Sequence, residues 1–308
     1  MLTVGLVVPT MNSASFVQES LHSIFQQTGD FRIHVHVQDG GSSDGTQELV
    51  RQLSETVAGD RKLISTSFAS SADSGVAQAL NNGFRHLDAD IFGWLGSDDI
   101  LFPGALSSVV SHVVQTRSQW VTGLPTVIDT TGRILSLRGK QGPHRYPTGF
   151  ARGLLARGFH SNGLVGGIQQ EGTFWTRDLW NQSGGYIDES LKLAFDYELW
   201  CRLARHSEVV QLVAPLAAFR IRSGQLSSNA DLYRSEVAKV KRSLRERGVG
   251  ASMPSTFRDF QRPVSFLSPV SAEWTTRRYT FGGKPFSRLA EKLFSARGKQ
   301  ESKKWPTW

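Results

Sequence analysis

The first 118 residues of the chain alternate regularly between two kinds of segment. Short apolar segments rich in β-branched residues are expected to form strands: 3–8, 33–38, 61–66 and 91–95. The longer segments between and after them have helical spacing: 13–27, 46–57, 74–87 and 103–116. Because strands that alternate with helices usually pair in parallel, this order predicts an α/β fold with a Rossmann-like, mostly parallel sheet and helices on both faces.

The second part of the chain is less regular. Short strands are expected at 119–137 and 208–219, and helices at 195–206 and 231–248. Residues 139–170 are rich in Gly, Arg and His, and they predict loops around one helix near 148–157. Pro and Ser residues beyond position 250 predict a linker.

This organisation predicts one large domain and an extension. The domain is expected to cover residues 1–230, with a regular first half (1–118) and a less regular second half (119–230). Residues 231–308 are expected to form a helix and a basic helical tail.

The positive charge of the chain is concentrated in this tail. Of the formal net charge of +8, residues 251–308 carry 11 Lys and Arg against 4 Asp and Glu, a net of +7. The first 250 residues are therefore nearly neutral, which argues against a nucleic-acid-binding protein. No apolar stretch reaches the roughly 20 residues needed to span a bilayer, and the N-terminus has no basic region typical of a secretory signal, so a cytoplasmic protein is expected.

Residues 285–297 place apolar side chains at helical spacing among Lys and Arg residues. A basic amphipathic helix of this kind can bind the anionic inner face of a membrane peripherally. The same segment could instead pack on the catalytic body with its charged face in solvent, and the sequence leaves both interpretations open.

Gly96 and Ser97 follow the expected strand 91–95, and two adjacent acids, Asp98 and Asp99, come directly after them. In an open α/β sheet, ligands bind at the carboxyl ends of the strands. Carboxylates at that edge can hold Mg²⁺ or Mn²⁺ against the phosphates of a substrate. The same two acids could also cap the following helix, so the pair alone does not decide between a metal site and a cap.

Several motifs along residues 3–230 together resemble glycosyltransferase family 2. They are VPTMN (8–12), QDGGSSDGT (38–46), DSGVAQALNNG (73–83), WLGSDD (94–99), IQQEGTFW (168–175), GGYIDESL (184–191) and FDYELWCRL (195–203). Each motif is weak alone, but their order and spacing are specific. The resemblance implies a GT-A fold and an inverting, metal-dependent transfer from a nucleotide-diphosphate sugar, with UDP as the expected nucleotide, to a hydroxyl acceptor. It also implies that residues 1–118 form the nucleotide-sugar-binding half and residues 119–230 the half that carries the acceptor site and the catalytic base.

The resemblance also assigns residues to the nucleotide. Pro9, Thr10 and Asn12 are expected to line the base site. Asp39 resembles the acid that pairs with the uracil edge, although a simple turn would also place an Asp there. Asp73 is expected near the same nucleotide.

Three further acids receive the chemical roles. Asp98 resembles the acid on the ribose or phosphate side, and Asp99 the ligand of Mg²⁺ or Mn²⁺. Asp196 matches the catalytic base, which takes the proton of the attacking hydroxyl group. A first-turn acid that complements the helix dipole is the alternative for Asp196.

On the acceptor side, Gln170, Glu171 and Trp175 are expected, with Trp175 as a platform for a sugar face. Relatives often carry a His where Arg222 stands. Since Arg cannot ligate a metal but can pair with phosphate oxygens, Arg222 or Arg220 is expected to contact the diphosphate.

The implied context is the assembly of a surface polysaccharide or glycolipid, with a saccharide or lipid-linked saccharide as acceptor. Two other functions are alternatives: a sugar-phosphate nucleotidyltransferase and a catalytically silent carbohydrate-binding or scaffold protein. The former would need a Gly-rich basic loop after the first strand, which residues 9–13 do not provide. The latter would be favoured if Asp196 pointed away from the other acids.

Overall fold

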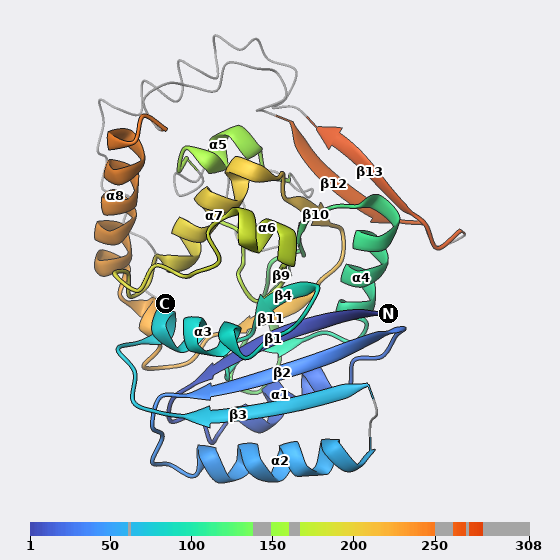
Figure 1. Cartoon of the computed structure of the whole chain (residues 1–308), viewed down its shortest axis with the longest axis vertical. Coiled ribbons are helices and arrows are strands. Elements are labelled where there is room, and N and C mark those ends of the chain that lie inside the picture. The colour runs from blue at the N-terminus through green and yellow to red at the C-terminus, as the bar shows by residue number, and fades with distance from the viewer. Residues whose placement is uncertain (61–62, 138–148, 160–166, 250–260, 269–270, 280–308) are drawn as a thin grey trace.

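A large mixed sheet forms the centre of the molecule (Figure 1). The computed structural model describes residues 1–60, 63–137, 149–159, 167–249, 261–268 and 271–279. The nine-stranded sheet has the order β13-β12-β10-β6-β9-β4-β1-β2-β3. Its strands are β1 (Leu2–Thr10), β2 (Phe31–Asp39), β3 (Ile64–Ser70), β4 (Ile91–Trp94), β6 (Trp120–Thr122), β9 (Thr173–Thr176), β10 (Val210–Leu212), β12 (Arg262–Leu267) and β13 (Trp274–Tyr279).

Most neighbouring strands in this sheet run parallel. The strands β4, β1, β2 and β3 are parallel throughout, whereas β9 pairs antiparallel with both β4 and β6. A second, four-stranded sheet has the order β5-β11-β7-β8. Its strands are β5 (Ile100–Leu101), β7 (Thr126–Ile128), β8 (Ile134–Leu137) and β11 (Ala217–Arg220). The predicted mostly parallel α/β sheet is therefore confirmed.

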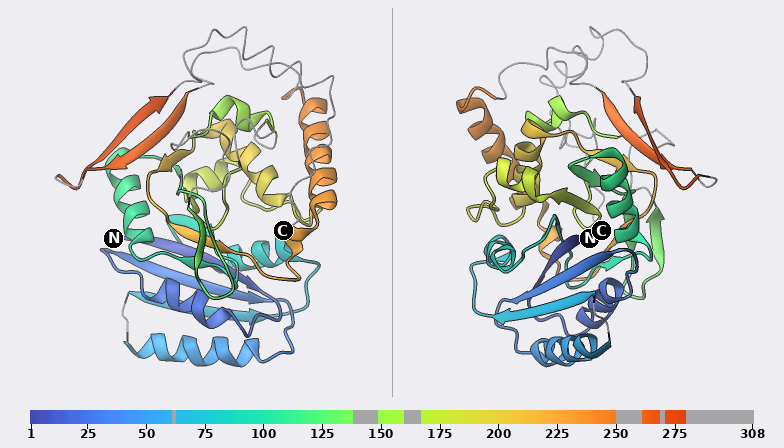
Figure 2. Two further views of the ribbon diagram at one scale, coloured as in Figure 1. Left: turned by 180° about the vertical axis from the view of Figure 1, so that it is seen from behind. Right: turned by 45° about the vertical axis from the view of Figure 1, so that its right-hand side comes forward.

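Helices cover both faces of the sheet (Figures 1 and 2). They are α1 (Val17–Phe25), α2 (Thr46–Asp60), α3 (Val76–Arg85), α4 (Ala105–Thr116), α5 (Arg152–Ala156), α6 (Arg177–Gln182), α7 (Phe195–His206) and α8 (Ala230–Glu246), with a short 3-10 helix η1 (Leu226–Ser228). None of the helices within the described ranges is both long and apolar enough to cross a bilayer.

The alternation of side chains along β1 explains the two hydrophobic cores. Val4, Leu6 and Val8 belong to a core that includes residues of α1, α2 and α4. Val7 points to the opposite face, into a core with residues of α3, α6 and α7. Since successive side chains of a strand point to opposite faces, one apolar strand buries residues on both sides of the sheet.

The region directly after residue 250 differs from the expectation of a linker. Residues 262–267 and 274–279 form the antiparallel pair β12–β13, and β12 extends the sheet beside β10. Contacts with α4 hold this pair: the Trp274 indole N–H donates to Ser111 at 3.0 Å, and His112 Nε2 lies 2.8 Å from Ser265 Oγ. The sheet thus continues beyond the expected boundary at residue 230. The basic segment 285–297 lies outside the described residues.

Candidate active site

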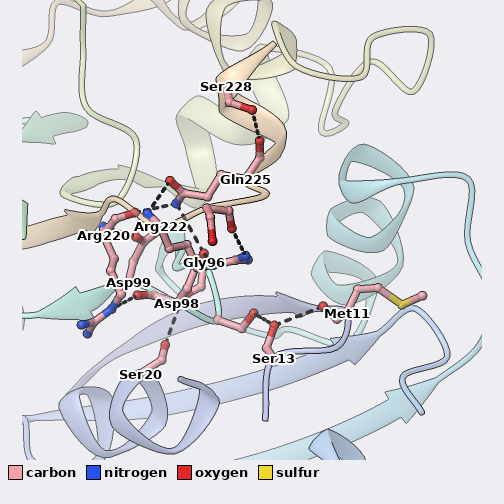
Figure 3. A network of polar contacts seen from close by, with 12 residues as sticks. Met11, Ser13, Ser20, Gly96, Asp98, Asp99, Arg220, Arg222, Gln225 and Ser228 are labelled. Carbon is pink, nitrogen blue, oxygen red and sulfur yellow. Dashed lines mark hydrogen bonds and ion pairs between the residues drawn. The ribbon is translucent and has the colours of Figure 1, made fainter. Parts of the chain in front are cut away.

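Asp98 and Asp99 follow β4 at the carboxyl end of the sheet, but they occupy unequal positions (Figure 3). Asp99 is 3% exposed, and its Oδ1 accepts the backbone N–H of Arg220 at 2.8 Å. The Asp98 side chain is 16% exposed, and its Oδ2 forms an ion pair with Nε of Arg222 at 2.6 Å. Of the two carboxylates, that of Asp98 is therefore the more accessible.

The remaining oxygens of both acids lie beside Gly96. A Cβ atom at this position would approach Asp98 Oδ1 to 3.1 Å and would collide with Asp99 Oδ2. The lack of a side chain at Gly96 therefore lets one oxygen of each carboxylate lie close to its backbone. Oxygen atoms of one or two carboxylates are the protein ligands that Mg²⁺ prefers when it also binds substrate phosphates. These residues thus fit a divalent cation.

Arg220 anchors this region and is not available to a ligand. The residue is fully buried, and its guanidinium donates to Glu19 Oε2 at 2.7 Å and to the backbone oxygens of Asp98 and Asp129 at 2.7 and 3.0 Å. Because the Arg220 donors already hold three segments together, Arg222 is the better placed of the two arginines to contact a diphosphate. Arg222 keeps the partly exposed position.

Asp196 and Glu171 complete a set of four carboxylates with Asp98 and Asp99. Glu171 lies in the turn before β9, and the charges of Asp196 and Asp98 both raise its pKa. The charges of Glu171 and Asp98 likewise raise the pKa of Asp99. Glu171 therefore interacts both with the acids after β4 and with Asp196 in the first turn of α7. We call Asp98, Asp99, Glu171 and Asp196 the central carboxylates.

Burial is the main cause of the high pKa values in this set. Burial raises the pKa of Asp196 to about 6. The backbone N–H of Tyr197 donates to its Oδ1 at 2.6 Å, and this hydrogen bond lowers the pKa but only in part offsets burial. Burial also raises the pKa of Glu171 to about 7. Within the described residues, Glu171 Oε2 has no hydrogen-bond partner. A buried acid with a pKa near neutrality and little hydrogen bonding is typical of functional sites.

The Asp39 carboxylate has a different environment. Asp39 is fully buried, and its oxygens accept hydrogen bonds from the backbone N–H groups of Gly41 and Ser42 and from the hydroxyl groups of Ser42 and Ser70. Burial alone would raise the pKa of Asp39, but these four donors lower it. In this structure Asp39 therefore holds its loop, as a turn acid does, and the expected contact with a uracil edge does not fit its burial.

The other residues expected at the nucleotide lie around the same loop. Asn12 is exposed, and its Oδ1 accepts the Ser43 N–H at 3.0 Å. Asp73 is half-buried, and its Oδ2 would lie 3.1 Å from a Cβ atom on Gly40, while Oδ1 accepts the Gly75 N–H. Asp73 therefore offers a carboxylate oxygen at this loop, which Asp39 does not.

The end of β1 contributes two further residues of the predicted base site. Pro9 is half-buried, whereas Thr10 is 5% exposed. Within the described residues, the buried Thr10 Oγ1 has no hydrogen-bond partner. A buried hydroxyl without a partner is costly, so it is a candidate contact for a ligand.

The residues predicted on the acceptor side separate into two groups. Gln170 is half-buried, and its side-chain N–H donates to the Trp94 carbonyl at 2.7 Å, which ties the turn of Glu171 to the end of β4. Trp175 is 1% exposed and packs among Trp94, Trp180 and Trp200. In this structure the Trp175 ring is buried within the protein, so the predicted stacking on a sugar face is not supported.

Two functional contacts were not predicted from the sequence. Gln225 accepts the Arg222 N–H at 3.0 Å and donates to the Arg220 carbonyl at 2.5 Å, so it shapes the turn that presents Arg222. Glu19, on α1, forms an ion pair with Arg220 at the end of β11. Neither residue carries a local motif, since both act through partners that are distant in sequence. Within the described ranges, no group of three or more His, Cys, Asp or Glu side chains is arranged to hold a metal by itself.

Comparisons with known proteins identify relatives of the chain. The family model of glycosyl transferase family 2 matches residues 6–168. An uncharacterised glycosyltransferase of Rickettsia prowazekii is 24% identical over 230 residues, which cover 74% of this chain and 66% of the relative. The chain thus spans slightly less than two thirds of that relative. A PGL/p-HBAD biosynthesis glycosyltransferase of Mycobacterium bovis is 33% identical over 99 residues, which cover 32% of this chain and 36% of the relative.

Solved structures show the same fold. S. aureus TarS (1–349) in complex with UDP-GlcNAc gives a TM-score of 0.62 at 17% identity, with 83% of this chain and 69% of that chain covered. A mannosyltransferase of Pyrobaculum calidifontis in complex with GDP-Man and Mn²⁺ gives a TM-score of 0.59 at 18% identity, with 82% and 65% covered. These likenesses confirm the predicted GT-A fold.

Proposed function

This chain belongs to glycosyl transferase family 2, and we propose that it transfers a sugar from a nucleotide-diphosphate sugar to a hydroxyl group with inversion at the anomeric carbon. The observation that carries this proposal is that Glu171 interacts both with Asp98 and Asp99 after β4 and with Asp196 on α7. An alcohol that attacks a sugar needs a base on its side of the anomeric carbon. The departing diphosphate needs positive charge on the other side. The central carboxylates and Arg222 supply groups for both tasks.

Asp196 is the proposed catalytic base. With its pKa raised to about 6 by burial, it is ionised at neutral pH and still basic enough to accept a proton efficiently. In the proposed reaction, the acceptor oxygen forms a bond to the anomeric carbon as its proton passes to the Asp196 carboxylate. The bond between the anomeric carbon and the diphosphate breaks, and the diphosphate leaves with the electron pair.

Asp98 is the proposed main ligand of the divalent cation, in place of the expected Asp99. Its carboxylate is the more exposed of the two, whereas Asp99 already accepts the Arg220 N–H. Mg²⁺ or Mn²⁺ bound beside Gly96 would neutralise charge on the diphosphate. Arg222 is the proposed second source of positive charge, because a guanidinium pairs with phosphate oxygens in a fork.

The nucleotide is proposed to be UDP. Support comes from the fold shared with TarS, which was solved with UDP-GlcNAc, although the Pyrobaculum mannosyltransferase was solved with GDP-Man. Asn12, Asp73 and the buried Thr10 hydroxyl are the proposed contacts on the nucleoside side. The carboxylate that contacts the nucleobase is thus proposed to be that of Asp73 rather than that of Asp39, because Asp39 has no exposed surface.

The acceptor is proposed to be a saccharide or a lipid-linked saccharide, in the assembly of a surface polysaccharide or glycolipid. The similarity of one third of the chain to a PGL/p-HBAD biosynthesis glycosyltransferase supports this class. Peripheral contact with the inner face of the cell membrane remains part of the proposal, through the basic segment 285–297.

A binding and turnover experiment tests the proposed function. Thermal unfolding of the wild-type protein is measured with UDP or GDP, each with and without Mn²⁺, because a ligand that binds the folded state raises its stability. We expect UDP with Mn²⁺ to give the largest shift. Transfer or hydrolysis of the matching UDP-sugars is then measured for Asp196→Asn, with Asp178→Asn in the exposed first turn of α6 as the control.

Asp196→Asn should keep the UDP shift and lose about 10²- to 10⁴-fold in turnover, the usual contribution of a general base. Asp178→Asn should match the wild type. No shift with either nucleotide, or full turnover of Asp196→Asn, would contradict the proposal.

A further inference from the structure

The ion pair between Arg222 and Asp98 occupies the carboxylate that we propose as the main metal ligand (Figure 3). Nε of Arg222 donates to Asp98 Oδ2 at 2.6 Å, and the side-chain N–H of Gln225 lies 3.5 Å from the same oxygen. The two charged side chains are only 28% and 16% exposed. An ion pair that is largely shielded from water is stronger than one on the open surface.

Arg222 is nevertheless held much less firmly than its neighbour Arg220. The Arg220 guanidinium is fully buried and bonded to three oxygens from three segments. The Arg222 guanidinium has the bond to Asp98 and a long bond of 3.4 Å to the Ser223 carbonyl, and it lies 5.8 Å from the Phe16 ring. Its backbone, in contrast, is fixed by Gln225. The side chain can therefore turn to a new partner while the turn stays in place.

We propose that Arg222 is the resident counter-ion of Asp98, and that it makes the binding of the divalent cation depend on the nucleotide. This inference rests on the proposed function, because it takes a nucleoside diphosphate as the ligand. Without nucleotide, the guanidinium neutralises Asp98 and repels a second cation. When a diphosphate binds, its oxygens give the guanidinium a bidentate partner of higher charge, and Asp98 becomes free for the metal.

Cooperativity between the two ligands follows from this exchange. Whichever ligand binds first must separate Arg222 from Asp98, and this costs free energy. The second ligand then binds without that cost, because the ion pair is already broken. By linkage, the nucleotide then strengthens metal binding by the same factor by which the metal strengthens nucleotide binding. Arg222 is thus a positioning residue for the metal as well as a contact for the diphosphate.

The test measures Mn²⁺ binding directly, by the electron paramagnetic resonance signal of free Mn²⁺ at pH 7.5, first without nucleotide and then with saturating UDP. In the wild type we expect weak binding of Mn²⁺ alone and binding at least about fivefold tighter with UDP, within the usual range of such coupling. In Arg222→Gln we expect Mn²⁺ alone to bind at least about fivefold tighter than in the wild type. UDP should add little to this, and its own affinity should fall.

Two variants serve as controls. Arg222→Lys keeps a positive charge beside Asp98, so Mn²⁺ alone should bind as weakly as to the wild type. Arg234→Gln removes an Arg from the exposed ion pair with Asp231 on α8, and it should change neither affinity. A merely structural role for Arg222 would not tighten metal binding when the charge is removed.

Equal affinity of Arg222→Gln and the wild type for Mn²⁺ alone would overturn the inference, and so would the absence of Mn²⁺ binding in both. An equal gain from UDP in both proteins would also overturn it. If neither protein binds UDP, the proposed function fails for that nucleotide, but the measurement with Mn²⁺ alone still decides whether Arg222 competes for Asp98.

Discussion

The loop after β2 and the central carboxylates place buried acids in two opposite environments. Asp39 accepts four hydrogen bonds, and these donors lower its pKa despite its burial. Glu171 is buried and Asp196 is half-buried, both with few donors, and removal from water raises their pKa values to about 7 and about 6. Burial alone therefore does not identify a functional acid. The hydrogen bonds that a carboxylate already accepts decide whether it holds a loop or is ready for a ligand.

The largest stability effect should come from the loop acid. Asp39→Asn removes the buried negative charge that accepts four hydrogen bonds. It also replaces one acceptor oxygen by an amide N–H₂ group, which faces donors that it cannot satisfy. Because unsatisfied buried groups each cost about 1–3 kcal/mol, we expect the free energy of unfolding to fall by about 2–4 kcal/mol. Chemical denaturation measures this loss. Asp30→Asn, at an exposed position, should stay within about 0.5 kcal/mol of the wild type. Similar stabilities for both variants would break the comparison.

At Asp196, replacement by Asn is expected to raise the free energy of unfolding at pH 8 instead of lowering it. In the folded state its pKa rises from 3.8 to about 6, so the folded protein binds this proton more tightly than the unfolded chain. The stability that this proton contributes is complete below pH 3.8 and is lost as the pH rises to about 6. Asp196→Asn should therefore stabilise the protein at pH 8 by about 1–2 kcal/mol, since one pKa unit corresponds to about 1.4 kcal/mol and part of the residue is exposed.

Unfolding experiments at pH 4 and pH 8 measure this difference. The stabilisation should be present at pH 8 and nearly absent at pH 4. The contribution of Asp39 runs the other way: with a lowered pKa, it is present above the pKa of the unfolded chain and is lost as the medium becomes more acidic. If Asp196→Asn destabilised the protein at pH 8, the raised pKa would be refuted.

The smallest effect tests a single donor to Asp39. Ser70→Ala removes one hydroxyl bond, of 2.6 Å, to the carboxylate, and it should cost about 1 kcal/mol because one hydrogen bond contributes about that much. Ser71→Ala is the matched control, since the neighbouring Ser71 contacts Asp39 only through its backbone N–H. The two melting curves separate the side-chain bond from the general effect of a Ser→Ala change in this turn.

Much of the fold could be predicted from the sequence because the first half has a clear period. Apolar strands and amphipathic helices alternate there, and β1, β2 and β4 form close to the expected positions. The strand expected at 61–66 forms at Ile64–Ser70 instead. The pair β12–β13 could not be predicted from local pattern, because contacts from α4, such as that of Ser111 with Trp274, hold it.

The sequence was enough to predict which residue types gather at the site. It was not enough to predict which of them are exposed to a ligand and which are buried. Adjacent acids after an apolar strand indicated a ligand site at the sheet edge. Which of the two faces outward depends on the Arg220 N–H, a donor 121 residues away from Asp99. Trp175 shows the same limit: an aromatic residue beside a catalytic motif serves packing equally well, and only the surrounding Trp side chains reveal its burial.

The position of β12 beside β10 bears on how the protein can be shortened for laboratory work. A chain cut at residue 249 would lose both outer strands and expose the backbone N–H and C=O groups along one side of β10. Uncovered sheet edges recruit strands from other molecules and promote aggregation. A version that stops just after residue 279 keeps the edge capped, and it is the better choice for keeping a trimmed protein dispersed at high concentration.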